Sequence, residues 1–138
     1  MTREEMQSIV ETAVMGIVSQ GGPSAVFDGQ GARCQYLSQS GRRCAIGLFL
    51  NDVSALQNCM VAESYEVQDA LMQNGVPVRG LTDIAFLQEL QNAHDFAATE
   101  SLVAHQNDFD AHVFFRRFSL AIEKICTEHE LRFPGELI

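Results

Sequence analysis

The spacing of apolar residues predicts a helix at the start of the chain. From Met6 to Val18, apolar residues recur every three or four positions, which places them on one face of a helix. Thr2, followed three residues later by Glu5, has the form of a capping box, and Gly21-Gly22-Pro23 ends the helix. Residues 1–21 are therefore expected to form an N-terminal helix with one buried face.

A β-hairpin is predicted over residues 32–50, after a glycine-rich loop over 22–31. Residues 32–37 and 43–50 favour strands, and the polar turn between them contains Gly41, which adopts the left-handed conformation at little cost. Side chains alternate between the two faces of a strand, and one face of this hairpin therefore holds Cys34, Tyr36, Cys44, Ile46 and Leu48. Because two strands are not stable alone, we expect this face to pack on helices.

The segment 64–131 is predicted to be mainly helical, whereas the pattern over residues 53–62 is ambiguous. The three helices expected there run from Ser64 to Asn74, from a Thr82 cap to about Ala98, and from an Asp108 or Asp110 cap to about Glu130. The whole chain, 1–138, is then a single α+β domain with about four helices packed on a small antiparallel β-hairpin or sheet.

Charge is concentrated in one part of the chain. The net charge is −9, and the stretch from Asn51 to Phe115 holds ten acidic residues and one base, Arg79. Such a stretch repels nucleic acid and anionic membrane surfaces, and suits a protein partner with a basic surface. The sequence has no apolar run long enough for a membrane span and no signal peptide at its start, so a cytoplasmic protein is expected.

One short motif stands out against this ordinary composition. The hairpin carries the pattern Cys34-x-Tyr36-x4-Gly41-x2-Cys44-Ala45-x-Gly47, and the later helix carries Leu90-Gln91-x2-His94-Asp95. Together these stretches resemble a group of phage- and prophage-borne small proteins of unknown function. The resemblance implies a phage-type accessory role and brings no catalytic assignment with it. Gly47 is expected to mark a bulge or a close backbone contact.

The candidate site consists of Cys34, Cys44 and His94, with Asp95 beside it. His94 follows Leu90 by four residues, so it projects from the buried helix face rather than into water. An imidazole beside two thiols is a ligand set for zinc, or a base with a cysteine nucleophile. A structural zinc site needs four ligands, and only Cys59 and His112 are further candidates.

The alternative for these residues is structural. Buried cysteines in reduced proteins usually pack as small apolar groups, and His94 would then bond a backbone carbonyl. The adjacent pair His94-Asp95 is also similar to the metal dyad of HD-type phosphohydrolases, which need further His and Asp ligands; the other histidines are His105, His112 and His129.

Taken together, the sequence favours a non-enzymatic accessory protein that binds a host protein, without a cofactor. An anti-defence or host-takeover role would suit the phage context. Two alternatives stay open. One is a small metal-binding protein or hydrolase using Cys34, Cys44 and His94. The other is a homo-oligomeric structural protein in which the first helix supplies the interface.

Overall fold

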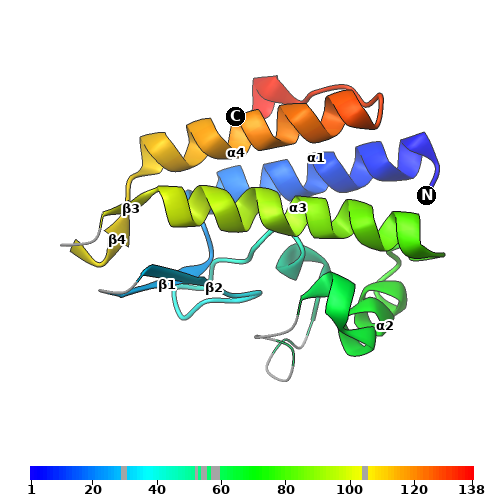
Figure 1. The fold of residues 1–138 in the computed structure, drawn as a ribbon, viewed down its shortest axis with the longest axis horizontal. Helices are drawn as coiled ribbons and strands as arrows, with labels where there is room; N and C mark the ends of the chain where they lie inside the picture. The colour runs from blue at the N-terminus through cyan, green and yellow to red at the C-terminus, as the bar shows by residue number, and fades with distance from the viewer. Residues whose placement is uncertain (29–30, 52, 54–55, 57–59, 104–105) are drawn as a thin grey trace.

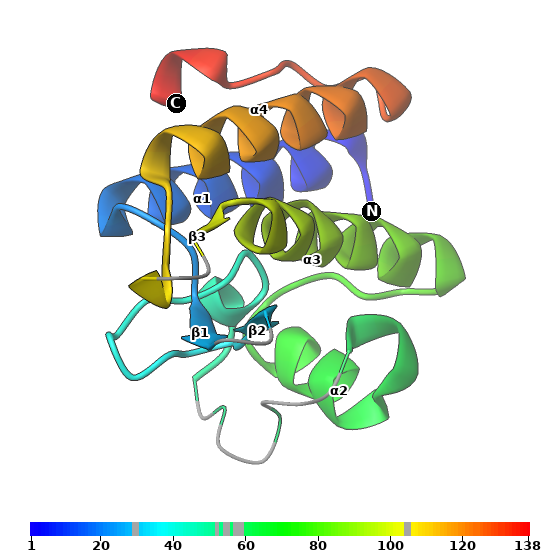
Figure 2. The same ribbon diagram turned by 60° about the vertical axis from the view of Figure 1, so that its left-hand side comes forward.

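Three long helices lie alongside one another and form the body of the molecule (Figures 1 and 2). The computed structural model describes residues 1–138 except 29–30, 52, 54–55, 57–59 and 104–105. The long helices are α1 (Arg3–Gln20), α3 (Leu81–Glu100) and α4 (Ala111–Glu128). A fourth, shorter helix, α2 (Tyr65–Gln73), lies with the β1–β2 hairpin on the side of α3 away from α4.

The remaining described elements are short. Two antiparallel pairs are formed by β1 (Ala25–Asp28) with β2 (Gly31–Cys34), and by β3 (Leu102–Val103) with β4 (Asp108–Phe109). Single 3₁₀ turns occur at η1 (Gly47–Phe49), η2 (Val61–Glu63) and η4 (Gly135–Leu137). The architecture is therefore α+β and mostly helical, as the sequence predicts.

The helix ends follow the capping chemistry read from the sequence, with one exception. Thr2 and Glu5 form the predicted capping box at α1, and Ser64 and Asp110 accept backbone hydrogen bonds at the starts of α2 and α4. Thr82, the predicted cap of α3, instead lies inside that helix.

The start of α3 is held by an acid rather than by a cap. The Asp83 carboxylate accepts a hydrogen bond from the Arg79 backbone N–H (2.8 Å) and contacts the Met1 ammonium at 2.5 Å. Burial alone would raise the pKa of Asp83, but these hydrogen bonds outweigh burial and lower it.

The strands lie earlier in the chain than predicted. The segment 22–31, predicted as a loop, contains β1, and Cys34 pairs with Ala25 rather than with Ile46. Of the predicted hairpin over 32–50, the turn survives as a single bridge between Leu37 and Arg43. The prediction was wrong about the second strand because the backbone after Cys44 turns inward as η1 instead of continuing the ladder.

A single core joins the four helices and most of the short elements. The apolar stripe predicted for α1 is buried, as are the inward residues of α3 and α4. The predicted hairpin face also enters this core through Tyr36, Cys44 and Ile46. Each fully buried Val, Leu, Ile or Phe side chain in this core stabilises the fold by about 1.5–3 kcal/mol relative to an exposed one.

Candidate functional site

The first motif forms a compact turn that is docked on α3. Gly41 has φ +87°, the left-handed conformation predicted for the turn, and Ser38 N–H donates to the Arg42 carbonyl across it (2.9 Å). Buried beneath the turn, Tyr36 Oη accepts a hydrogen bond from Gln91 Nε2 (3.1 Å). Since Gln91 belongs to the second motif, the two motifs contact each other directly.

The residues that follow the turn explain the Cys44-Ala45-x-Gly47 spacing. Cys44 Sγ accepts a hydrogen bond from the Gly47 N–H (3.2 Å), and Ala45 is fully buried. A Cβ on Gly47 would lie 2.0 Å from the Tyr36 carbonyl oxygen. This is the close backbone contact expected at Gly47, and no side chain larger than hydrogen fits there.

His94 connects the second motif to the start of β1. Its ring is fully buried, and Nε2 accepts a hydrogen bond from the Ser24 backbone N–H (2.9 Å). Nδ1 therefore carries the proton and donates to Asp95 Oδ1 at 2.8 Å. The predicted bond to a backbone carbonyl is wrong, because the backbone group that reaches the ring is a donor.

The thiols of Cys34 and Cys44 are both held in their neutral form. Cys34 Sγ donates to the Asp95 carbonyl oxygen at 3.8 Å, and burial, followed by the Asp95 carboxylate, raises the pKa of Cys34. Burial likewise raises the pKa of Cys44 to about 12, with Asp95 adding to the effect. Because the thiolate is the nucleophilic form, neither cysteine is activated for attack.

A metal would find only part of a site here. The ligand atoms of Cys34, His94 and Asp95 lie within 4.8 Å of one another, but Cys44 does not belong to this group. Both nitrogens of His94 already have partners, so a metal would have to displace one of them. Of the predicted fourth ligands, Cys59 lies outside the described residues, and His112 is exposed at the start of α4 and belongs to neither ligand group found among the described residues.

The dyad typical of HD-type phosphohydrolases is not assembled in the described part of the chain either. His94 and Asp95 bond each other, and the Asp95 side chain is only one quarter exposed. His129 lies at the far end of α4 from His112, and His105 lies outside the described residues. Two adjacent ligands without their partners on neighbouring helices do not hold a metal in that manner.

Ser24 is the one member of this cluster that sequence reasoning missed. It is fully buried beside His94, and its Oγ has no hydrogen-bond partner among the described atoms. The order Ser24–His94–Asp95 is that of a hydrolase triad, but the bond to Nε2 comes from the Ser24 backbone and not from Oγ. With the serine and the imidazole both buried, a substrate has no access, so the cluster is a polar link in the core. Ser24 lay in a predicted loop, and no signal in the sequence pointed to it.

A second feature lies on the surface, where α2 meets the start of α3. Tyr65 and Leu81 are 81% and 83% exposed, and both line a groove of about 220 Å³. Ile84 and Gln68 lie in the groove wall, and Glu63 lines its rim. We call this surface the α2–α3 face.

Comparison of the chain with protein-family models, with curated proteins and with solved structures finds no match. Among the described residues, no helix combines the length and the hydropathy needed to cross a bilayer.

Proposed function

We propose that this protein is a non-enzymatic binding module that engages the basic surface of a protein partner through the α2–α3 face. The observation that carries the proposal is the combination of two large exposed apolar side chains, Tyr65 and Leu81, that line one groove. Exposed aromatic and aliphatic residues around a concave site are typical of the anchors that dominate protein interfaces.

The charges around this face select the kind of partner. Glu63 lines the groove and Glu66 and Asp69 are exposed on α2, and none of the three forms an ion pair within the described chain. Arg79, the base nearest in sequence, is already engaged by Glu5 through two hydrogen bonds of 2.8 and 2.9 Å. An uncompensated acidic rim attracts lysine and arginine and repels phosphate backbones, which favours a basic protein surface over nucleic acid.

The interior cluster supports a binding role over an enzymatic one. The thiols of half-buried Cys34 and buried Cys44 are neutral and His94 is inaccessible, which favours a packing role for these three residues over a catalytic one. With the resemblance to small phage and prophage proteins, this favours a cytoplasmic accessory protein that binds a host protein. Anti-defence or host takeover is the form of that role that the context suggests.

The test is capture from bacterial lysate at low and at high salt, followed by identification of the bound protein. We expect one stoichiometric partner whose capture weakens with salt, because screening removes the attraction of the acidic rim. The double variant Tyr65→Ala/Leu81→Ala should lose the partner, since two interface anchors together are worth several kcal/mol.

Matched controls are available on α4, away from the face. Leu120 is an exposed leucine and Glu123 an exposed acid, so Leu120→Ala and Glu123→Lys should retain the partner. By contrast, Glu63→Lys should weaken capture. Equal capture by the face variants and the α4 controls, or no partner from several hosts, would contradict the proposal.

A further inference from the structure

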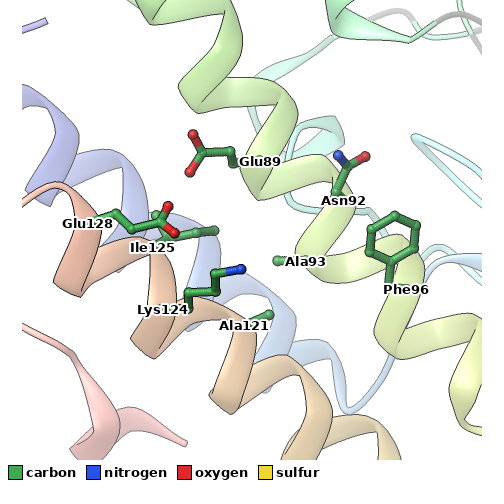
Figure 3. Close-up of a pocket in the computed structure, with 8 residues that line it drawn as sticks. All are labelled: Glu89, Asn92, Ala93, Phe96, Ala121, Lys124, Ile125 and Glu128. Atoms are coloured by element: carbon green, nitrogen blue, oxygen red, sulfur yellow. The ribbon is translucent and has the colours of Figure 1, made fainter.

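A second group of metal-type ligands lies at the other end of the α3–α4 pair from the hairpin. Glu89 comes from α3, and Glu128 and His129 come from the last residues of α4. Their ligand atoms all lie within 4.8 Å of one another, and His129 Nε2 is 3.2 Å from Glu89 Oε2. Figure 3 shows the side chains of Glu89 and Glu128 reaching towards each other from the two helices.

The imidazole of this group is oriented by packing. The ring of His129 stands edge-on to Phe86 with the ring centres 5.1 Å apart, and the His129 side chain is one quarter exposed. Its backbone N–H caps α4 by donating to the Ile125 carbonyl (3.0 Å). The position of Nε2 is thus set by the fold and not by a freely rotating surface side chain.

The electrostatics leave negative charge uncompensated at this point. Glu128 makes no ion pair or hydrogen bond within the described chain, although the Glu89 carboxylate is its neighbour. Glu128 also lies in the last turn of α4, where the unpaired carbonyls carry the negative end of the helix dipole and no base is present. Among the described residues, His129 contacts Glu89, whereas Glu128 beside it has no ion-pair partner.

Lys124 is a cation that lines the same groove as the two acids. It reaches into the same groove one turn before Glu128 (Figure 3), but no described ion pair joins it to Glu89 or Glu128. A divalent cation would neutralise both carboxylates at once and would replace the repulsion between them by two attractive bonds.

We propose that Glu89, Glu128 and His129 bind a zinc ion, with a water in the fourth position. His129 Nε2 and Glu89 Oε2 are in hydrogen-bond contact at 3.2 Å, and zinc would replace the proton between them. Bonds of about 2.0–2.1 Å in a tetrahedron place neighbouring donor atoms about 3.3 Å apart, so this pair needs little movement to take the metal. The imidazole selects a transition metal over calcium or magnesium, which prefer all-oxygen sites. This site is independent of the α2–α3 face and of the cysteine cluster.

The first experiment titrates zinc into the full-length protein by calorimetry. We expect one equivalent to bind, with His129→Ala and Glu128→Gln each lowering the affinity at least about tenfold, since each removes one of three ligands. His112→Ala and Glu123→Gln remove the same chemical groups elsewhere on α4 and should leave the affinity unchanged. Cys34→Ser should also leave it unchanged.

A second measurement separates loss of a ligand from damage to the fold. Because Glu128 is exposed and adds to the repulsion, Glu128→Gln should raise the melting temperature of the metal-free protein while abolishing the increase that zinc gives the wild type. In addition, cobalt bound at this site should lack the sulfur-to-metal charge-transfer band of a cysteine-ligated ion.

Three outcomes would overturn the assignment. One is unchanged zinc affinity in both His129→Ala and Glu128→Gln. The others are loss of binding in Cys34→Ser and a sulfur charge-transfer band with cobalt, both of which would move the metal to the hairpin cluster.

Discussion

At the scale of single residues, the polar groups inside this protein are placed to satisfy backbone atoms. His94 accepts from Ser24 N–H, Cys44 accepts from Gly47 N–H, and Gln91 Oε1 accepts from Val61 N–H at 3.2 Å. Each buried side chain supplies the partner that an irregular backbone segment would otherwise lack. The two motifs thus form a loop that folds back onto α3. Such a loop needs polar residues in the core to bond its backbone atoms.

His94→Ala should therefore be strongly destabilising. The substitution leaves the Ser24 N–H buried without an acceptor and empties the volume of the ring, at a combined cost of about 3 kcal/mol or more. The measurement is the free energy of unfolding in urea. Asp95→Asn is the control, because an amide oxygen still accepts from Nδ1, and it should cost about 1 kcal/mol. A His94→Ala protein as stable as Asp95→Asn would contradict the structural role given to this ring.

At the scale of elements, the start of α1 and the segment before α3 are joined by charge. Arg79 donates two hydrogen bonds to the Glu5 carboxylate, which also accepts from the Thr2 N–H. The hydrogen bonds from Arg79, with the Thr2 bond second, lower the pKa of Glu5 from 4.5 to about 2. Because the folded pKa is the lower one, the pair stabilises the fold above pH 4.5, and this contribution is lost as the pH falls towards 2.

Glu5→Gln should make unfolding less dependent on pH in that interval. Glutamine preserves the capping-box acceptor for Thr2 but removes the charge that titrates. Urea midpoints measured from neutral pH down to about 2 should fall less steeply in the variant than in the wild type. Glu4→Gln is the control, because Glu4 lies in the same turn without a contact to Arg79; equal slopes in all three proteins would refute the argument.

At the scale of the whole molecule, α1 is part of the core rather than an added surface helix. Its buried stripe, which includes Val10, Val14 and Ile17, belongs to the same core as the inward faces of α3 and α4. Because the apolar stripe of α1 is already buried in this core, an oligomer in which α1 supplies the interface would have to use the exposed side of the helix.

Ile17→Ala tests whether the layers unfold as one unit. Ile17 is fully buried, so the substitution should lower the free energy of unfolding by about 2–5 kcal/mol, with far-UV and near-UV transitions still coincident. Met15 lies on the same helix with 54% exposure, and Met15→Ala should stay within about 0.5 kcal/mol of the wild type. Separate transitions in the two spectra would show that α1 unfolds on its own.

The sequence by itself determined the helices and their inward faces. The capping residues Thr2, Ser64 and Asp110 and the three-to-four spacing of apolar positions are local signals, and local signals decide where a helix begins and which side is buried. The turn at Gly41 and the close contact at Gly47 could also be predicted. Glycine lacks a Cβ, so its presence indicates a left-handed conformation or a close contact of the backbone at its own position.

Tertiary structure alone decided where the strands lie and what the site residues do. Pairing of β1 with β2 depends on which segments meet, and the residues after Cys44 turn inward because Gly47 packs against the Tyr36 carbonyl. Likewise, the partner of His94 is a backbone N–H seventy residues away, and the proposed zinc site joins Glu89 to two residues about forty positions later. Contacts between distant residues depend on how whole helices pack, and the local sequence pattern does not predict that packing.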